Sequence, residues 1–101
     1  MSQRLSAEHR RAQIIGEARA LSLTKGLYQW GMSDLANQCG VSKGTVSYHL
    51  SSATQVRKAL VLDAIEKRDL SILAQAIISH DPVVASIDPG LRDAAIRSVV
   101  E

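Results

Sequence analysis

Several residue types are scarce in this chain of 101 residues. Phenylalanine is absent, aromatic residues make up 3%, and there are two prolines and one cysteine. A single cysteine excludes an intrachain disulfide framework and favours a reducing compartment. No apolar run reaches the roughly 18 residues that a membrane span needs, and none follows the opening charges as in a signal peptide. The sequence therefore predicts a soluble, cytoplasmic protein.

The apolar content, in contrast, is ample at 46%, and it consists mainly of leucine, isoleucine, valine and alanine. A core without large aromatic side chains favours closely packed helices. No stretch alternates between apolar and polar residues for long, as a half-buried strand would. The sequence therefore predicts an all-α fold with one modest core.

Three helices are expected in the front half. Ser6 can cap the first, which should end near Lys25-Gly26, and its apolar residues recur at helical spacing at Ile14, Ile15, Ala18 and Leu21. A second short helix should begin at Met32. Ser42 can cap a third helix, in which Val46 and Leu50 face inward.

A long fourth helix is predicted from Ser52 to about Ser79. Its apolar residues cover more than one face, so we expect it to pack on the front helices and on a second copy of the chain. Asp81-Pro82 and Asp88-Pro89 each pair a capping side chain with a proline suited to the first helical position. They predict a short turn at 82–87 and a final helix over 89–100.

Charge is distributed unevenly along the chain. Residues 1–58 hold eight basic and three acidic groups, whereas residues 59–101 hold four basic and seven acidic groups. A basic front half joined to an acidic back half suits a polyanion-binding module with a separate assembly module. We predict a DNA-binding headpiece over 1–51 and a helical dimerisation region over 52–101.

The stretch "LANQCGVSKGTVSYHL" (35–50) has the spacing of a helix-turn-helix. Gly40 stands where the turn needs a positive φ. An α-helix fits the major groove of B-DNA, where its first residues reach base edges and its flanks reach phosphates. The predicted base-contacting residues are Lys43, Gly44 and Thr45, and the predicted phosphate-contacting residues are Ser42, Ser47, Tyr48 and Ser51. His49 either reaches a phosphate or packs at the rim of the core.

These motifs resemble the headpiece of tetracycline-repressor-type (TetR) regulators. "IIGEARALSLTKG" (14–26) is similar to the family's first helix, and "MSDLANQCGVSKGTVSYHL" (32–50) is similar to its helix-turn-helix. The resemblance implies DNA binding and dimerisation. We predict a homodimeric, sequence-specific repressor that reads a palindromic operator in double-stranded DNA through the recognition helix 42–50.

The chain also departs from the family pattern. Gly31 replaces a capping threonine, Ser22 a core aromatic residue, and Ser47 a tyrosine. Ala53 replaces the phosphate-binding lysine that usually opens the fourth helix, and we expect Arg57 or Lys58 to substitute for it. About 50 residues follow the headpiece, too few to build a dimer interface and also enclose a pocket of roughly several hundred Å³. The resemblance therefore does not extend to a small-molecule inducer.

Other kinds of site find little support. The three histidines are too scattered for a metal site, no catalytic arrangement can be recognised, and no cofactor is predicted. Cys39 is interpreted as a small core residue, with a redox sensor as the alternative. Arg10 and Arg11 either touch phosphate or are solvated.

Dimerisation is assigned to the apolar back half. The residues expected near the centre of the interface are Ile72, Leu73, Ile77, Leu91 and Ile96. Two alternatives to a repressor remain open: a helical protein-interaction or assembly module, and a DNA-binding accessory factor for replication, partition or recombination of a mobile element.

Overall fold

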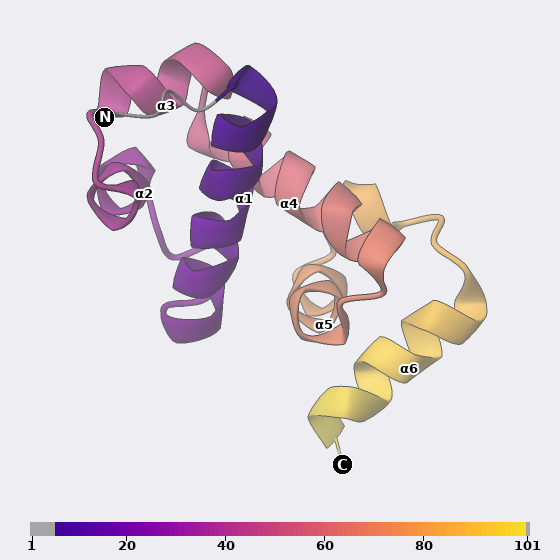
Figure 1. Ribbon diagram of the computed structural model, residues 1–101. Coiled ribbons are helices and arrows are strands. Elements are labelled where there is room, and N and C mark those ends of the chain that lie inside the picture. The colour runs from indigo at the N-terminus through magenta and orange to yellow at the C-terminus, as the bar shows by residue number, and fades with distance from the viewer. Residues whose placement is uncertain (1–5, 101) are drawn as a thin grey trace.

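The computed structural model describes residues 6–100, and within this range all regular secondary structure is helical, without a strand. Figure 1 shows the order of the elements: α1 (Ala7–Thr24), α2 (Met32–Cys39), α3 (Lys43–His49), α4 (Ala53–Lys67), α5 (Leu70–Ile78), the short 3-10 helix η1 (Pro82–Val84) and α6 (Pro89–Val100). The predicted all-α fold is confirmed. No helix among the described residues is both long and apolar enough to cross a membrane.

Most helix starts are set by the capping residues predicted from the sequence. The side chains of Ser6, Ser42 and Ser52 each accept a hydrogen bond from the backbone N–H three residues on. Asp81 caps η1 by accepting from the N–H of Val83 at 2.9 Å. The Asp88 carboxylate accepts from the N–H of Leu91 at 3.1 Å, at the start of α6. These local signals explain why the boundaries of α1, α3 and α6 were predictable.

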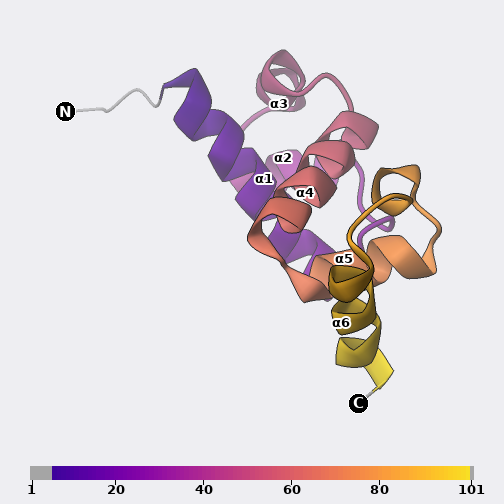
Figure 2. The same ribbon diagram turned by 90° about the vertical axis from the view of Figure 1, so that its right-hand side faces the viewer.

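The predicted continuous helix over 52–79 is wrong, because the chain breaks between α4 and α5. Arg68 adopts the left-handed conformation with φ +57° and ends α4. The N–H of Asp69 bonds to the carbonyl of Ala64, and the N–H of Arg68 to that of Ile65, which satisfies the last carbonyls of the helix. Figures 1 and 2 show α5 turned sharply away from α4. The two apolar faces seen in the sequence therefore belong to two separate helices.

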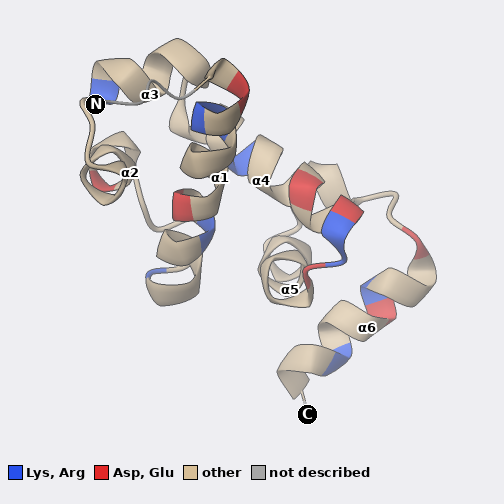
Figure 3. Ribbon diagram, in the orientation of Figure 1, with Lys and Arg blue, Asp and Glu red and all other residues tan. Residues whose placement is uncertain are grey.

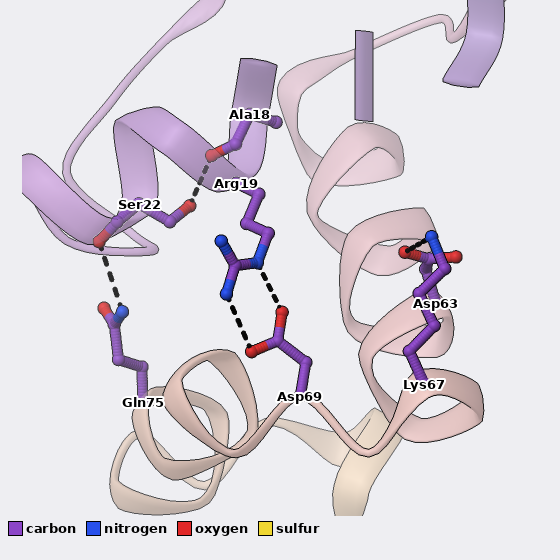
Figure 4. Close-up of polar contacts among 7 residues, drawn as sticks. All are labelled: Ala18, Arg19, Ser22, Asp63, Lys67, Asp69 and Gln75. Carbon is purple, nitrogen blue, oxygen red and sulfur yellow. Dashed lines mark hydrogen bonds and ion pairs between the residues drawn. The ribbon is translucent and has the colours of Figure 1, made fainter. Parts of the chain in front are cut away.

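An ion pair holds this corner against the front of the chain. The Arg19 guanidinium in α1 donates to both carboxylate oxygens of Asp69, with N–O distances of 2.6 and 3.2 Å (Figure 4). Such a two-point contact fixes the direction of both side chains. The ion pair joins α1 to Asp69, which is the N-cap residue of α5, and so supports the change of direction between α4 and α5.

Arg68→Gly is expected to raise the free energy of unfolding by about 0.5–1 kcal/mol. Glycine takes positive φ without the steric cost that arginine bears, although part of the gain is lost to its greater freedom in the unfolded chain. Urea denaturation would measure the change. The matched control is Arg92→Gly in the exposed part of α6, which should lower stability by about 1 kcal/mol. A lower free energy of unfolding for Arg68→Gly would contradict steric strain at the positive φ of Arg68.

The core runs through the whole elongated molecule, which measures 46 × 23 × 22 Å. Its front part joins α1, α2, α3 and α4 through Ile14, Leu35, Val46 and Leu60, all at most 1% exposed. Its back part is formed by α5 with α6, η1 and the end of α4. α4 thus contributes to both parts, and the division of the chain at residue 51 stays a prediction.

The predicted centre of the dimer interface needs correction for four of its five residues. Ile72 and Leu73 are fully buried within the single chain, and Ile77 and Leu91 are 7% and 3% exposed. Because α5 folds back, α6 and the rest of the same chain cover these side chains. Only Ile96, which is 38% exposed, is available to a partner.

Candidate nucleic-acid interface

The turn between α2 and α3 has the geometry expected of a helix-turn-helix. Gly40 adopts φ +72°, and the N–H of Val41 bonds to the carbonyl of Ala36 at 3.0 Å, closing the end of α2. Val46 on α3 is completely buried, and Leu50 just after it is nearly so. These contacts fix which side of α3 faces outward.

The outward side of α3 presents the residues predicted to read bases. Lys43 and Gly44 are exposed, and Thr45 is half-buried. The Ser42 hydroxyl lies 3.1 Å from the Thr45 hydroxyl and also accepts from the Thr45 N–H. This pairing orients Thr45, whose hydroxyl can still turn toward a base.

The residues predicted to bind phosphates are placed unequally for that role. Tyr48 is 84% exposed, and its ring stands edge-to-face with that of His49, with centroids 5.1 Å apart. Ser51 is also exposed. Ser47 donates its hydroxyl proton to the carbonyl of Lys43 at 2.9 Å, so it must break this bond to donate to a phosphate. His49 is half-buried. This exposure is compatible both with a phosphate contact and with packing at the rim of the core.

The charge on α3 suits an approach to phosphates. Figure 3 shows a basic residue at its beginning and no acidic residue along it. Acidic residues lie instead near the end of α4, just before α5 and α6, and within α6 (Figure 3). The absence of carboxylates from α3 removes the repulsion that would oppose a polyanion.

Arg57, the predicted substitute for the phosphate-binding lysine, is engaged in contacts within the chain. Its Nε donates to the carbonyl of Leu27 at 3.0 Å, and its Nη2 donates to the carbonyl of Trp30. The guanidinium also lies over the Trp30 ring, 4.6 Å from its centroid. The side chain therefore holds loop 25–31, which joins α1 to α2, and is not free for DNA.

The remaining basic candidates lie at different places. Lys58 is exposed and borders a hollow of about 420 Å³ that is lined in addition by Tyr28, Thr54, Arg57, Asp81, Pro82 and Val83. This places it beside η1. Arg10 donates to Gln13 at 2.7 Å, while Arg11 is exposed in a hollow between α1 and α4. The role of Lys58 as a phosphate contact stays a prediction.

Partial burial raises the pKa of two side chains, Cys39 at the end of α2 and Tyr28 in loop 25–31. Partial burial, together with the nearby Glu17 carboxylate, raises the pKa of the Cys39 thiol. A protonated thiol is a poor nucleophile, which favours the interpretation of Cys39 as a packing residue. Burial first, and then the hydrogen bond to Asp81, raises the pKa of Tyr28 well above its ordinary value.

Ser22 and Trp30 form a buried polar network that was not predicted from the sequence. The Ser22 hydroxyl donates to the carbonyl of Ala18 at 2.7 Å and accepts from the indole N–H of Trp30 at 2.9 Å. Ser22 thus replaces the family's aromatic residue with a partner for a tryptophan. A buried indole needs such an acceptor, and the single tryptophan of the chain was the available signal. Similarly, Asp34 compensates for Gly31 by accepting from its backbone N–H at 2.9 Å.

Residues 6–100 contain no group of histidine, cysteine, aspartate or glutamate side chains arranged to hold a metal ion. Every buried side-chain nitrogen or oxygen in the same range has a hydrogen-bond partner.

Comparison with known proteins finds that the region around this turn is similar to one family model. Residues 14–60, from the second turn of α1 to the middle of α4, match the family model described as "Bacterial regulatory proteins, tetR family". The comparisons with curated proteins and with solved structures found no match. The matched range contains α2, α3 and the turn between them. Residues 14–60 therefore form a helix-turn-helix headpiece of the type that this family model of bacterial regulators describes.

Proposed function

We propose that the protein is a homodimeric transcriptional repressor that inserts α3 into the major groove of a palindromic operator. The observation that carries the proposal is the outer side of α3, where Lys43, Gly44 and Tyr48 are exposed without any acidic neighbour on the helix. Lysine can donate to guanine O6 and N7, and a helix of this diameter fits the groove. A bound repressor would block access to the promoter.

A dimer is proposed because one short helix buries too little surface for a typical specific affinity. Two headpieces related by a two-fold axis would read two half-sites about one helical turn apart. The outer side of α6 offers the surface for this contact: Ile96, Val99 and Val100 are 38%, 56% and 76% exposed. They recur at helical spacing, and burying them in an isologous contact would remove apolar area from water.

The direct test of DNA binding is Lys43→Gln. We expect it to weaken binding to duplex DNA by about tenfold or more, because a bidentate contact to guanine contributes roughly 1–3 kcal/mol. The measurement is fluorescence anisotropy with a labelled duplex over a range of salt concentrations. Wild-type affinity should fall linearly on a log–log plot as salt increases. Lys67→Gln removes the same charge from the end of α4 and should behave as wild type. If the two substitutions weakened duplex binding equally, the proposal that α3 contacts DNA would be contradicted.

Thr45→Ala is expected to relax the preference at one base pair in each half-site, by about 1–3 kcal/mol at most. The threonine methyl can contact a thymine methyl, and its hydroxyl can bond to either type of base pair. Sequencing the duplexes selected by the variant and by the wild type would measure the change. Identical preferences at every position would remove Thr45 from the residues that read bases.

A further inference from the structure

Loop 25–31 is held largely by residues from the back of the chain. Gln75 on α5 accepts a hydrogen bond from the N–H of Leu27 at 2.7 Å and donates to the carbonyl of Ser22 at 3.2 Å. Figure 4 shows Gln75 reaching from α5 to Ser22 near the end of α1. One side chain thus binds both the last turn of α1 and the loop that follows it.

Residues of α4 and of the cap of η1 bind the same loop. Arg57 on α4 holds two of its carbonyls, and Asp81 accepts from the Tyr28 hydroxyl at 2.7 Å. Leu27 and Trp30 are almost completely buried. A loop of seven residues with this many partners has little freedom to move independently of α4 and α5.

The loop in turn fixes the start of the helix-turn-helix. Gly31 is the N-cap of α2, and its N–H is bound by Asp34 while its carbonyl accepts from the N–H of Leu35 at 3.1 Å. α2 packs against both α1 and α3. A displacement of the loop would therefore shift the first turn of α2 and, through α2, the direction of α3.

We propose that Gln75 is a positioning residue for α3, so that a side chain on α5 controls how well the headpiece fits DNA. The inference rests on the proposed DNA binding, and it adds a connection between α5 and the reading helix. Gln75 touches neither α3 nor the groups proposed to contact DNA. Its effect passes through Leu27, the loop and the cap of α2.

The test compares Gln75→Met with Gln75→Glu and Leu91→Ala in the full chain. Methionine fills a similar volume and makes neither hydrogen bond, whereas glutamate keeps the acceptor for the Leu27 N–H and loses the donor to Ser22. Leu91→Ala creates a cavity between α6 and α5, far along the chain from the loop, and supplies a destabilised control. Two quantities are measured: amide chemical shifts without DNA, and duplex affinity per folded molecule well below the unfolding temperature.

We expect Gln75→Met to shift the amides of residues 32–50 and to weaken duplex binding about threefold to tenfold, the effect of one or two lost neutral hydrogen bonds. Gln75→Glu should give a smaller effect of the same kind, and it carries the test if the methionine variant does not fold. Leu91→Ala should shift amides around its own site, but leave those of residues 32–50 and the duplex affinity per folded molecule unchanged.

Shift changes confined to residues 22–31 and 70–78 would overturn the proposal, as would equal loss of affinity in Leu91→Ala. If the wild type itself shows no salt-dependent binding to duplexes, the proposed function fails. The amide shifts still decide in that case whether Gln75 positions α3.

Discussion

Leu73→Glu is expected to unfold the whole chain. Leu73 is fully buried in α5, and a glutamate there would place a carboxylate in the core without a partner. The expected loss exceeds about 4 kcal/mol, a large part of the roughly 5–15 kcal/mol that stabilises a domain of this size. Circular dichroism at 222 nm and urea titration would measure it. This outcome separates a core role of Leu73 from a place in a dimer interface.

Ile96→Glu is the matched control for Leu73→Glu. It introduces the same charge on the exposed side of α6, so the helical signal and the stability of the chain should be preserved. Sedimentation at micromolar concentration should instead show monomers, and operator binding should weaken. Folded monomers of Leu73→Glu would contradict the burial of α5 within a single chain. An Ile96→Glu protein with an unchanged association constant would move the dimer contact away from α6.

Arg57→Ala is expected to lower the free energy of unfolding by about 2–4 kcal/mol. The substitution removes two charge-assisted hydrogen bonds and leaves the carbonyls of Leu27 and Trp30 without their partner. It also uncovers the ring of Trp30. Trp30 is the single tryptophan of the chain, so its fluorescence reports directly on this site during urea denaturation.

Lys58→Ala provides the comparison for Arg57→Ala. Lys58 is the next residue on α4 and is exposed, so its removal should change stability by less than about 0.5 kcal/mol. If Arg57→Ala kept full stability and lowered only the salt dependence of DNA binding, Arg57 would contact phosphate after all. In that case the contacts with loop 25–31 would be dispensable.

The helices of the front half were predictable because their signals are local. Ser6 and Ser42 cap the helices they precede, and Gly40 supplies the positive φ at the turn. The break at Arg68 was not predictable in this way. A residue with positive φ at a helix end is usually glycine. An arginine between Lys67 and Asp69 is instead typical of the interior of an exposed helix.

The role of Arg57 was missed for a different physical reason. Its partners, Leu27 and Trp30, are backbone carbonyls in a loop about 30 residues earlier, and no spacing rule relates a side chain to distant carbonyls. The burial of Ile72 and Leu73 depended in turn on the break at Arg68. Because residues 52–79 were predicted to form one continuous helix, its second apolar face had to be assigned to a contact with another copy of the chain.

Selection of bound sequences from a random duplex pool tests most directly whether the protein reads a specific DNA sequence. The full chain is incubated with the pool at moderate salt, and the retained duplexes are sequenced after several rounds. A dimeric repressor that reads DNA through α3 should enrich a palindrome whose half-sites lie about one helical turn apart. A pool without enrichment, combined with binding that does not respond to salt, would contradict a repressor that reads DNA through α3.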